Sequence, residues 1–271
     1  MKPNYYSLTF RKTHFFLIFI LMSQYCLAYF PGDTIKPVPK INKTFLVSVH
    51  VVADASGNVK DSLPDVLQVL NQVNSIFSPI NAKFAVCEFD TISNYNYLSI
   101  RDTKKDPQAS EIRHLYNKPG RINIFYSSML TVNDIKACGL ASIGGIDYER
   151  GQSVLIVCNS ANTVAHELGH YFGLEHTFRG SGSELANGSN CQTEGDFICD
   201  TPADPYISSD PMKEYMNGDC KYISKKKDTN GQYYNPDPSN IMSYYPCYSS
   251  QFTKGQYERM VKTYLSNPQA W

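Results

Sequence analysis

The chain lacks an excess of charge of either sign, because its 25 lysines and arginines equal its 25 aspartates and glutamates. A chain without a basic excess has no electrostatic footprint for nucleic acid, so we expect no nucleic-acid partner. The sequence also has no internal repeat, no linker that would set an accessory domain apart, and no Cys-x-x-Cys pair. A thiolate zinc site is therefore not indicated, and 271 residues allow one large domain or two small ones.

Long hydrophobic runs are scarce, and the run at Phe15–Met22 near the N-terminus is too short to span a bilayer comfortably. Lysine and arginine precede this run, and Cys26-Leu27-Ala28 follows it as a small-residue cleavage pattern. These features predict a secretory signal peptide over residues 1–28, with an uncleaved anchor as the alternative. We expect a secreted protein, extracellular or periplasmic, without a stable membrane anchor after signal removal.

Removal of residues 1–28 leaves an odd number of cysteines in a protein that is free to form disulfides. At least one of them must stay free or pair elsewhere. The remaining cysteines are Cys87, Cys138, Cys158, Cys191, Cys199, Cys220 and Cys247.

The first half of the chain predicts a mixed sheet with one or two helices on it. A lead-in at 29–43 is rich in proline, glycine and lysine and is expected to be extended. A cap at Ser62 and an apolar stripe that reaches Phe77 predict a helix. Strands are predicted where β-branched, aromatic or alternating residues occur, at 44–52, 83–92, 122–126, 140–143 and 154–157.

The second half has a different character, because residues 179–240 are crowded with glycine, asparagine, aspartate, serine and proline. Such a segment cannot bury much core, so disulfides or bound ions must offset the entropy of ordering it. Thr253-x-x-Gln256 then predicts the start of a last helix, whose apolar stripe continues to Leu265.

Only six histidines occur, and three of them stand in one motif between the two halves. His166 and His170 are four residues apart, so one face of a helix presents both imidazoles to a shared metal ion, with Glu167 beside them. Gly173 permits a left-handed turn that ends the helix and returns His176 as a third ligand. Three neutral imidazoles leave the fourth tetrahedral position open, which indicates a catalytic zinc. A solvated helix with chance histidines is the alternative.

This motif resembles a known signature. His166-Glu167-x-x-His170-x-x-Gly173-x-x-His176 is similar to the long zinc signature of the metzincin metallopeptidases, and His176-Thr177-Phe178 resembles the pappalysin family among them. The resemblance is specific from about Gly139 to Met260. Three downstream segments resemble pappalysin segments in the expected order: Gly195-Asp196-Phe197-Ile198-Cys199-Asp200-Thr201-Pro202, Asn240-Ile241-Met242-Ser243-Tyr244, and residues 252–260.

The resemblance implies an α+β fold, a metzincin-like zincin catalytic domain over residues 44–271. Its upper subdomain, 44–176, would hold the mixed sheet and the active-site helix, and its lower subdomain, 177–271, would be loop-rich and stapled by disulfides. Met242 matches the methionine turn beneath the zinc, and Tyr244 matches a tyrosine that approaches the zinc or the developing oxyanion in related enzymes. Residues 139–145 match the edge strand that pairs with an extended substrate.

The resemblance also implies a set of disulfides. It favours Cys191 with Cys220 and Cys199 with Cys247, although the sequence alone allows three pairings of these four cysteines. Cys138 and Cys158 could pair as well, and Cys87 would then be left over.

Calcium is a second cation that the resemblance implies, near residues 195–204. Hard oxygen ligands would come from Asp196, Asp200, Thr201 and Asp204. A merely acidic, solvated loop is the alternative.

We therefore expect a secreted, monomeric zinc endopeptidase that acts on proteins or peptides, with Glu167 as the general base that activates the zinc-bound water. The alternative is a non-catalytic secreted binding module that retains the zincin fold. Glu167 argues against this alternative, because it ligates nothing in a three-histidine site. The lead-in at 29–43 holds no cysteine, so no cysteine-switch prodomain is expected.

The resemblance bears on specificity too. Arginine-preferring pappalysins carry an acidic residue after the tyrosine of the methionine turn, but Tyr244-Tyr245-Pro246-Cys247 has none. We expect no strong preference for arginine after the scissile bond, and expect aliphatic or aromatic residues there instead, unless Asp237 or Glu258 supplies the carboxylate.

Overall fold

The computed structural model describes residues 37–102, 107–144, 153–156, 158–245, 251–266, 268 and 271. Val38–Trp271 form one compact unit. The predicted signal peptide at 1–28 and much of the predicted lead-in at 29–43 lie outside the described residues. Within the described part of the chain, no helix is both long enough and apolar enough to cross a membrane.

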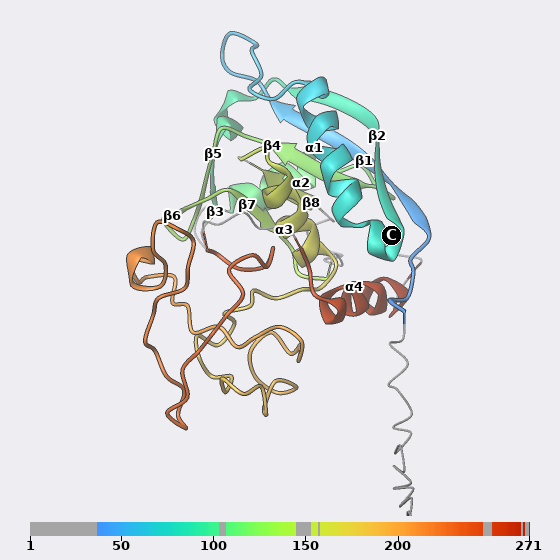
Figure 1. Ribbon diagram of the computed structural model, residues 1–271. Helices are drawn as coiled ribbons and strands as arrows, with labels where there is room; N and C mark the ends of the chain where they lie inside the picture. The colour runs from blue at the N-terminus through green and yellow to red at the C-terminus, as the bar shows by residue number, and fades with distance from the viewer. Residues whose placement is uncertain are drawn as a thin grey trace, which may run out of the picture. The chain divides into compact units, whose positions relative to one another are not determined.

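A five-stranded sheet with the order β2-β1-β4-β8-β7 forms the frame of this unit (Figure 1). The four parallel strands are β1 (Lys43–Val52), β2 (Ala82–Ile92), β4 (Ile122–Tyr126) and β8 (Ser153–Ile156). β7 (Gly139–Ala141) runs antiparallel to β8 and forms one edge. β1 and β4 are mostly buried and have near-continuous β-branched and aromatic runs, whereas the edge strand β2 alternates, and the sequence predicted these strands from those two patterns.

Two helices cover one face of this sheet. α1 (Leu63–Ile76) begins at the predicted cap, where Ser62 and Asp65 form a capping box. α3 (Ala161–Tyr171) packs beside α1 and carries the histidine motif. The core between these helices and the sheet is rich in buried aromatic side chains, including Phe45, Phe77, Phe84 and Phe172.

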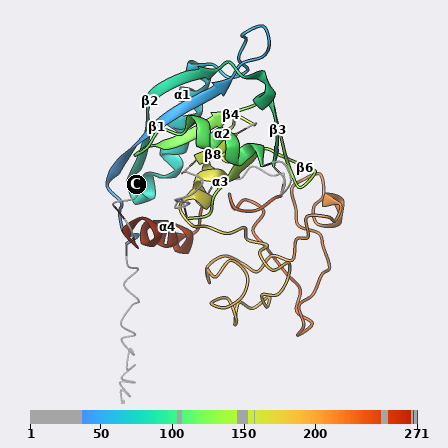
Figure 2. The same ribbon diagram turned by 180° about the vertical axis from the view of Figure 1, so that it is seen from behind.

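α2 lies over the other face of the sheet (Figure 2), and a second, three-stranded sheet with the order β3-β5-β6 shares a buried apolar cluster with the main sheet and α2. The bounds are α2 (Gln108–Tyr116), β3 (Ser99–Asp102), β5 (Met129–Val132) and β6 (Ile135–Ala137). A two-residue turn joins β5 to β6, and both its residues, Asn133 and Asp134, have positive φ, as this tight hairpin requires. The sequence did not predict this small sheet, because strands of three or four residues show too little periodicity.

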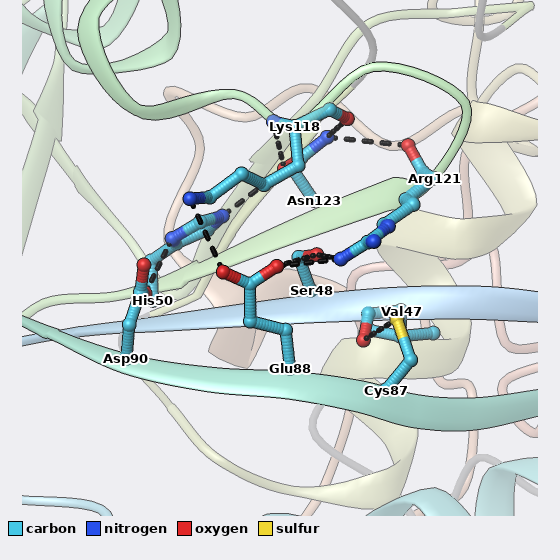
Figure 3. Close-up of polar contacts among 9 residues, drawn as sticks. All are labelled: Val47, Ser48, His50, Cys87, Glu88, Asp90, Lys118, Arg121 and Asn123. Atoms are coloured by element: carbon cyan, nitrogen blue, oxygen red, sulfur yellow. Dashed lines mark hydrogen bonds and ion pairs between the residues drawn. The ribbon is translucent and has the colours of Figure 1, made fainter.

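A polar network lies within the main sheet around the buried side chains of His50 and Asn123 (Figure 3). The His50 imidazole joins two strands, since Nδ1 lies 2.6 Å from Oδ1 of Asp90 and Nε2 lies 3.0 Å from Oδ1 of Asn123. The Asn123 amide donates to the Lys118 carbonyl at 2.9 Å and accepts from the Lys118 amide at 2.7 Å. His50 is therefore a structural residue that links β1 and β2 to the loop before β4, and it lies apart from the histidine motif.

The segment between α3 and the last helix is almost without regular structure, as the sequence predicted. Its described residues contain one short 3-10 helix, η3 (Met212–Glu214), and isolated bridges. Four side chains form a small core of its own: Tyr206, Tyr215, Met216 and Tyr245. The chain then enters α4 (Lys254–Ser266), whose predicted start is confirmed by the mutual hydrogen bonds of Thr253 and Gln256.

The disulfides correct the sequence-based pairing. Cys191 is bonded to Cys199, so the predicted pairs Cys191–Cys220 and Cys199–Cys247 are wrong. The chain between these two cysteines folds back because Gly195 and Phe197 both have positive φ, which brings the two Cα atoms to 5.0 Å. The spacing of the cysteines along the chain does not predict this reversal of chain direction.

The other cysteines fit the remaining expectations in part. Cys138 pairs with Cys158, as expected, and Cys87 is free and exposed. Cys220 is also disulfide-bonded, and Cys247 lies outside the described residues.

Candidate metal centre

The three histidines of the motif are brought together by the way α3 begins and ends. The Ser160 side chain accepts a hydrogen bond from the Thr163 amide at 3.2 Å and caps the helix. Gly173 has φ 86, the left-handed conformation that the sequence predicted, and its turn returns the chain toward the helix. His176 thus lies opposite His166 and His170, which occupy successive turns of α3.

The imidazole nitrogens converge on one point. Nε2 of His176 lies 3.2 Å from Nε2 of His166 and 3.0 Å from Nε2 of His170. The opposite nitrogens are occupied, because Nδ1 of His166 donates to the Ile241 carbonyl at 2.7 Å and Nδ1 of His170 donates to the Leu174 carbonyl at 2.8 Å. With Nδ1 protonated, the lone pairs of Nε2 face each other, an arrangement that a shared cation stabilises. These residues therefore fit a zinc ion.

Burial keeps the imidazoles neutral and ready to ligate. Burial, with a smaller contribution from the neighbouring histidines, lowers the pKa of His166 to about 3 and that of His176 to about 2. Burial lowers the pKa of His170 as well. Since metal ligation requires the neutral ring, the site is competent to bind metal at neutral pH.

Glu167 lies beside the ligands with only 6% of its surface exposed. Burial raises the pKa of its carboxyl group to about 8, against the opposing charge of Arg113, and a bound dication would counteract this rise. The backbone of β7 passes directly over the carboxylate: a Cβ atom on Gly139 would lie 2.5 Å from Oε1. A glycine at this position therefore lets the edge strand and the carboxylate face the same space.

Met242 lies beneath α3, as the methionine turn was expected to. It is fully buried, and a Cβ atom on Gly169 would lie 2.6 Å from its sulfur, so the helix and the turn are in close contact. The Asn240 side chain accepts from the Met242 amide at 2.9 Å, and the Thr177 amide donates to the Met242 carbonyl at 3.2 Å. The turn is thus tied to the segment that follows the third histidine.

Aromatic side chains surround His176. The Tyr244 ring centroid lies 4.6 Å from that of His176 and 5.8 Å from that of His166, and 46% of Tyr244 remains exposed. Burial raises the pKa of Tyr244 to about 12, so its hydroxyl is a donor at neutral pH. Phe178 stacks on His176 with a centroid distance of 4.7 Å. Sequence reasoning used Phe178 only as a family marker and missed this stacking contact.

A cavity of about 670 Å³ opens beside Glu167 and His166. Its floor is formed by α3 and by the methionine turn, with Asn162, Thr163, Ile241 and Tyr244 among the lining residues. Its walls come from β7 and from two regions that the sequence did not connect with the site: the β5–β6 hairpin and the loop that carries Ser208.

The four residues predicted as calcium ligands do not converge. Asp200 accepts from the Thr253 hydroxyl and the Gly255 amide, both at 2.7 Å, and so caps α4. Asp204 accepts from the hydroxyls of Thr177 and Tyr245, again at 2.7 Å.

Only Asp196 and Thr201 of the predicted set are in contact, with the Thr201 hydroxyl 2.9 Å from both carboxylate oxygens of Asp196. Among the described residues, the three histidines of the motif are the only group of three or more acidic, histidine or cysteine residues that could hold a metal ion.

A three-imidazole site closed by a glycine turn, with a glutamate on the same helix and a methionine turn beneath it, defines a metzincin-type zinc metallopeptidase. The chain belongs to the pappalysin family of these metallopeptidases: the family model for pregnancy-associated plasma protein-A matches residues 112–264.

Curated relatives carry names that agree with this family. An extracellular metalloprotease of Neurospora crassa is 30% identical over 243 residues, which cover 79% of this chain and 72% of that protein. One of Colletotrichum graminicola is 47% identical over 205 residues, covering 62% of this chain and 66% of that protein. One of Pyricularia oryzae is 28% identical, and the chain spans 65% of its length, slightly less than two thirds.

The fold also has a solved counterpart. Mature mirolysin of Tannerella forsythia, in complex with a cleaved peptide, aligns with a TM-score of 0.51 over 80% of this chain and 90% of that chain. At 19% identity this likeness concerns the fold.

Proposed function

We propose that the protein is a secreted zinc endopeptidase that hydrolyses internal bonds of proteins or peptides. The observation that carries the proposal is the placement of the Glu167 carboxylate between the converging imidazoles and the backbone of β7. In this placement the proton acceptor, the proposed metal site and the edge strand that would pair with substrate border the same space. The names of the extracellular relatives support secretion, and we expect the chain to act as a monomer.

Each residue has a distinct task in the proposed reaction. His166, His170 and His176 would hold the zinc, which when bound supplies Lewis acidity toward a water and the scissile carbonyl. Glu167 accepts the proton of the attacking water and later delivers it to the leaving amine nitrogen. The Tyr244 hydroxyl donates a hydrogen bond to the developing oxyanion.

The substrate backbone has a natural partner in β7. Among the described residues this strand pairs with β8 alone, so its other edge can accept an extended peptide in β-augmentation. Gly139 lies over Glu167, and a peptide paired there has its scissile bond within reach of the carboxylate. Residues 145–152, which include the end of the predicted edge segment 139–145, lie outside the described residues.

Casein hydrolysis tests the proposed function. We expect a zinc chelator to abolish hydrolysis and a stoichiometric amount of zinc to restore it. A protein that binds one zinc per chain yet cleaves neither casein nor a peptide library would instead be the non-catalytic binding module.

We further propose that one calcium ion is held by Asp196, Thr201 and Glu184, which revises the ligand set expected from the sequence. Glu184 is only 4% exposed, and its Oε1 has no hydrogen-bond partner. Burial raises the pKa of Glu184 and of Asp196 to about 7, and the charge of Asp196 contributes to the rise at Glu184. Ionising two neighbouring buried carboxyl groups is unfavourable unless a cation lies between them, and carboxylate oxygens are the ligands that calcium prefers.

Thermal unfolding with zinc held saturating tests the calcium proposal. At a free calcium concentration 100 times its Kd, binding adds about 2.7 kcal/mol of stability and raises Tm. A Tm that is indifferent to millimolar calcium would contradict the site.

A further inference from the structure

The β5–β6 hairpin forms one wall of the cavity beside Glu167. Five of its residues line this cavity: Val132, Asn133, Ile135, Lys136 and Ala137. Both ribbon views place β6 next to the orange part of the loop-rich segment between α3 and α4 (Figures 1 and 2). The hairpin continues through Cys138 directly into β7, so its position is coupled to that of the edge strand.

Chain direction assigns the cavity to one side of the scissile bond. A peptide that pairs antiparallel with β7 and has its scissile bond beside Gly139 continues, after that bond, along the residues that precede Gly139. Those residues are Cys138 and strand β6. The first turn of α3, with Asn162 and Thr163, lines the same cavity. The cavity therefore receives substrate residues that follow the cut.

The cavity contains one positive charge among its described lining residues. Lys136 and Glu167 are the charged residues of this lining, and the others are apolar or neutral. Glu167 serves the reaction. Lys136 is exposed, and no described residue forms an ion pair or hydrogen bond with its side chain. Its ammonium group is thus available to a ligand at the margin of a mostly apolar wall.

We propose that Lys136 recognises a carboxylate in the substrate segment that follows the scissile bond. This inference rests on the proposed endopeptidase function and names its substrate class: peptides with an aspartate, a glutamate or a free C-terminal carboxylate a few residues after the cut. It also gives a reason against arginine near this position, because Lys136 repels a guanidinium. An ammonium–carboxylate pair of this exposure favours the matched peptide by about fivefold in kcat/KM.

The test uses zinc-loaded full-length mature protein and pairs of fluorogenic peptides. The peptides of a pair differ only by glutamate against glutamine, at the first, second or third position after the cut, and each is made with a free and an amidated C-terminus. We expect wild type to prefer glutamate about fivefold at one position, or the free acid over the amide. The two arms identify which source supplies the carboxylate.

Variants assign the preference to Lys136. Lys136→Gln should abolish it, Lys136→Arg should keep it, and Lys136→Glu should invert it toward peptides with lysine or arginine at that position. Lys83→Gln is the matched control, since Lys83 is an exposed strand lysine on β2, outside the cavity lining. The control should keep the wild-type ratio, and equal Tm values would show that the variants are folded.

The inference and the proposed function fail separately. Equal kcat/KM within every pair for wild type, or a preference that survives in Lys136→Gln, overturns the role of Lys136 while peptidase activity stands. If wild type cleaves no peptide, the proposed function fails. Fluorescence anisotropy of the same peptide pairs with the Glu167→Gln protein then decides on Lys136, because binding of the carboxylate needs no catalysis; equal Kd values within the pairs overturn the inference.

Discussion

At the scale of single residues, the site depends on two positions where small changes have large effects. Glu167 provides the proposed base, and the three histidines would hold the metal without it. Gly139 lies against it on another strand, and the absence of a side chain there leaves room for the carboxylate. Neither residue is needed to hold the metal, so each can be altered with the metal centre intact.

Glu167→Gln should retain one zinc per chain and lose activity. The amide is nearly isosteric but cannot accept the proton of the attacking water, so kcat should fall by about 10²–10⁴-fold. Metal analysis and peptidase rates on the same sample check this. A Gln variant with wild-type kcat would rule out the mechanism.

Gly139→Ala should impair catalysis with little effect on folding. The added Cβ would lie 2.5 Å from Oε1 and 2.6 Å from Cγ of Glu167, so either the strand or the carboxylate must move. We expect a loss of about tenfold or more in kcat/KM. Gly218→Ala, where a Cβ meets nothing within 4 Å, is the control and should keep wild-type activity. An unimpaired Gly139→Ala protein would show that β7 does not constrain Glu167.

At the scale of elements, aspartates that the sequence suggested as ion ligands are anchors between segments. Asp200 connects the loop after Cys199 to the first turn of α4, and Asp204 connects the segment after the third histidine to Tyr245. The segment between α3 and α4 has few regular elements. Side-chain hydrogen bonds of this kind therefore hold it against the metal centre.

Asp200→Ala should destabilise the fold without affecting the reaction directly. It removes the acceptor of the Gly255 amide and of the Thr253 hydroxyl at the start of α4. The loss of a helix cap costs about 1 kcal/mol, which corresponds to a fall in Tm of about 2–4 °C. Thermal unfolding measures it against Asp219→Ala in an exposed turn. Equal Tm values for the two variants would mean that Asp200 does not stabilise α4.

At the scale of the whole molecule, stability should depend on pH through Glu184 and Asp196. Their pKa values rise from 4.5 and 3.8 to about 7 because both are buried. Without calcium, the folded state then binds more protons than the unfolded state between these values. Stability should therefore decrease as pH rises from about 4.5 to 7, and bound calcium should remove this decrease.

The difference in Tm between Glu184→Gln and wild type measures this effect, since pH effects on the zinc site are common to both. In calcium-free, zinc-saturated buffer the Gln variant should be the more stable at about pH 7.5, and its advantage should shrink toward about pH 5. Added calcium should instead favour wild type. A difference that does not change with pH would show that Glu184 is not the titrating group.

Much of the fold and of the metal centre could be predicted from the sequence because the signals are local. The offsets of His166, Glu167 and His170 define one helix face by themselves, and Gly173 marks the turn by its need for positive φ. The strand signals are local too, because β1 and β4 are mostly buried and have near-continuous apolar runs, and the edge strand β2 alternates.

The sequence by itself indicated the three-histidine cluster, the family and the strands of the main sheet, whereas the tertiary structure decided the contacts between distant segments. The Ile241 carbonyl that orients His166, the Cys191–Cys199 bond, the Glu184–Asp196 pair and the position of Lys136 in the cavity belong to this second group. The physical reason is that these contacts form where loops without periodicity fold back on each other. In these loops, which side chains and cysteines pair depends on which buried groups meet in three dimensions. Spacing along the chain does not predict these pairs.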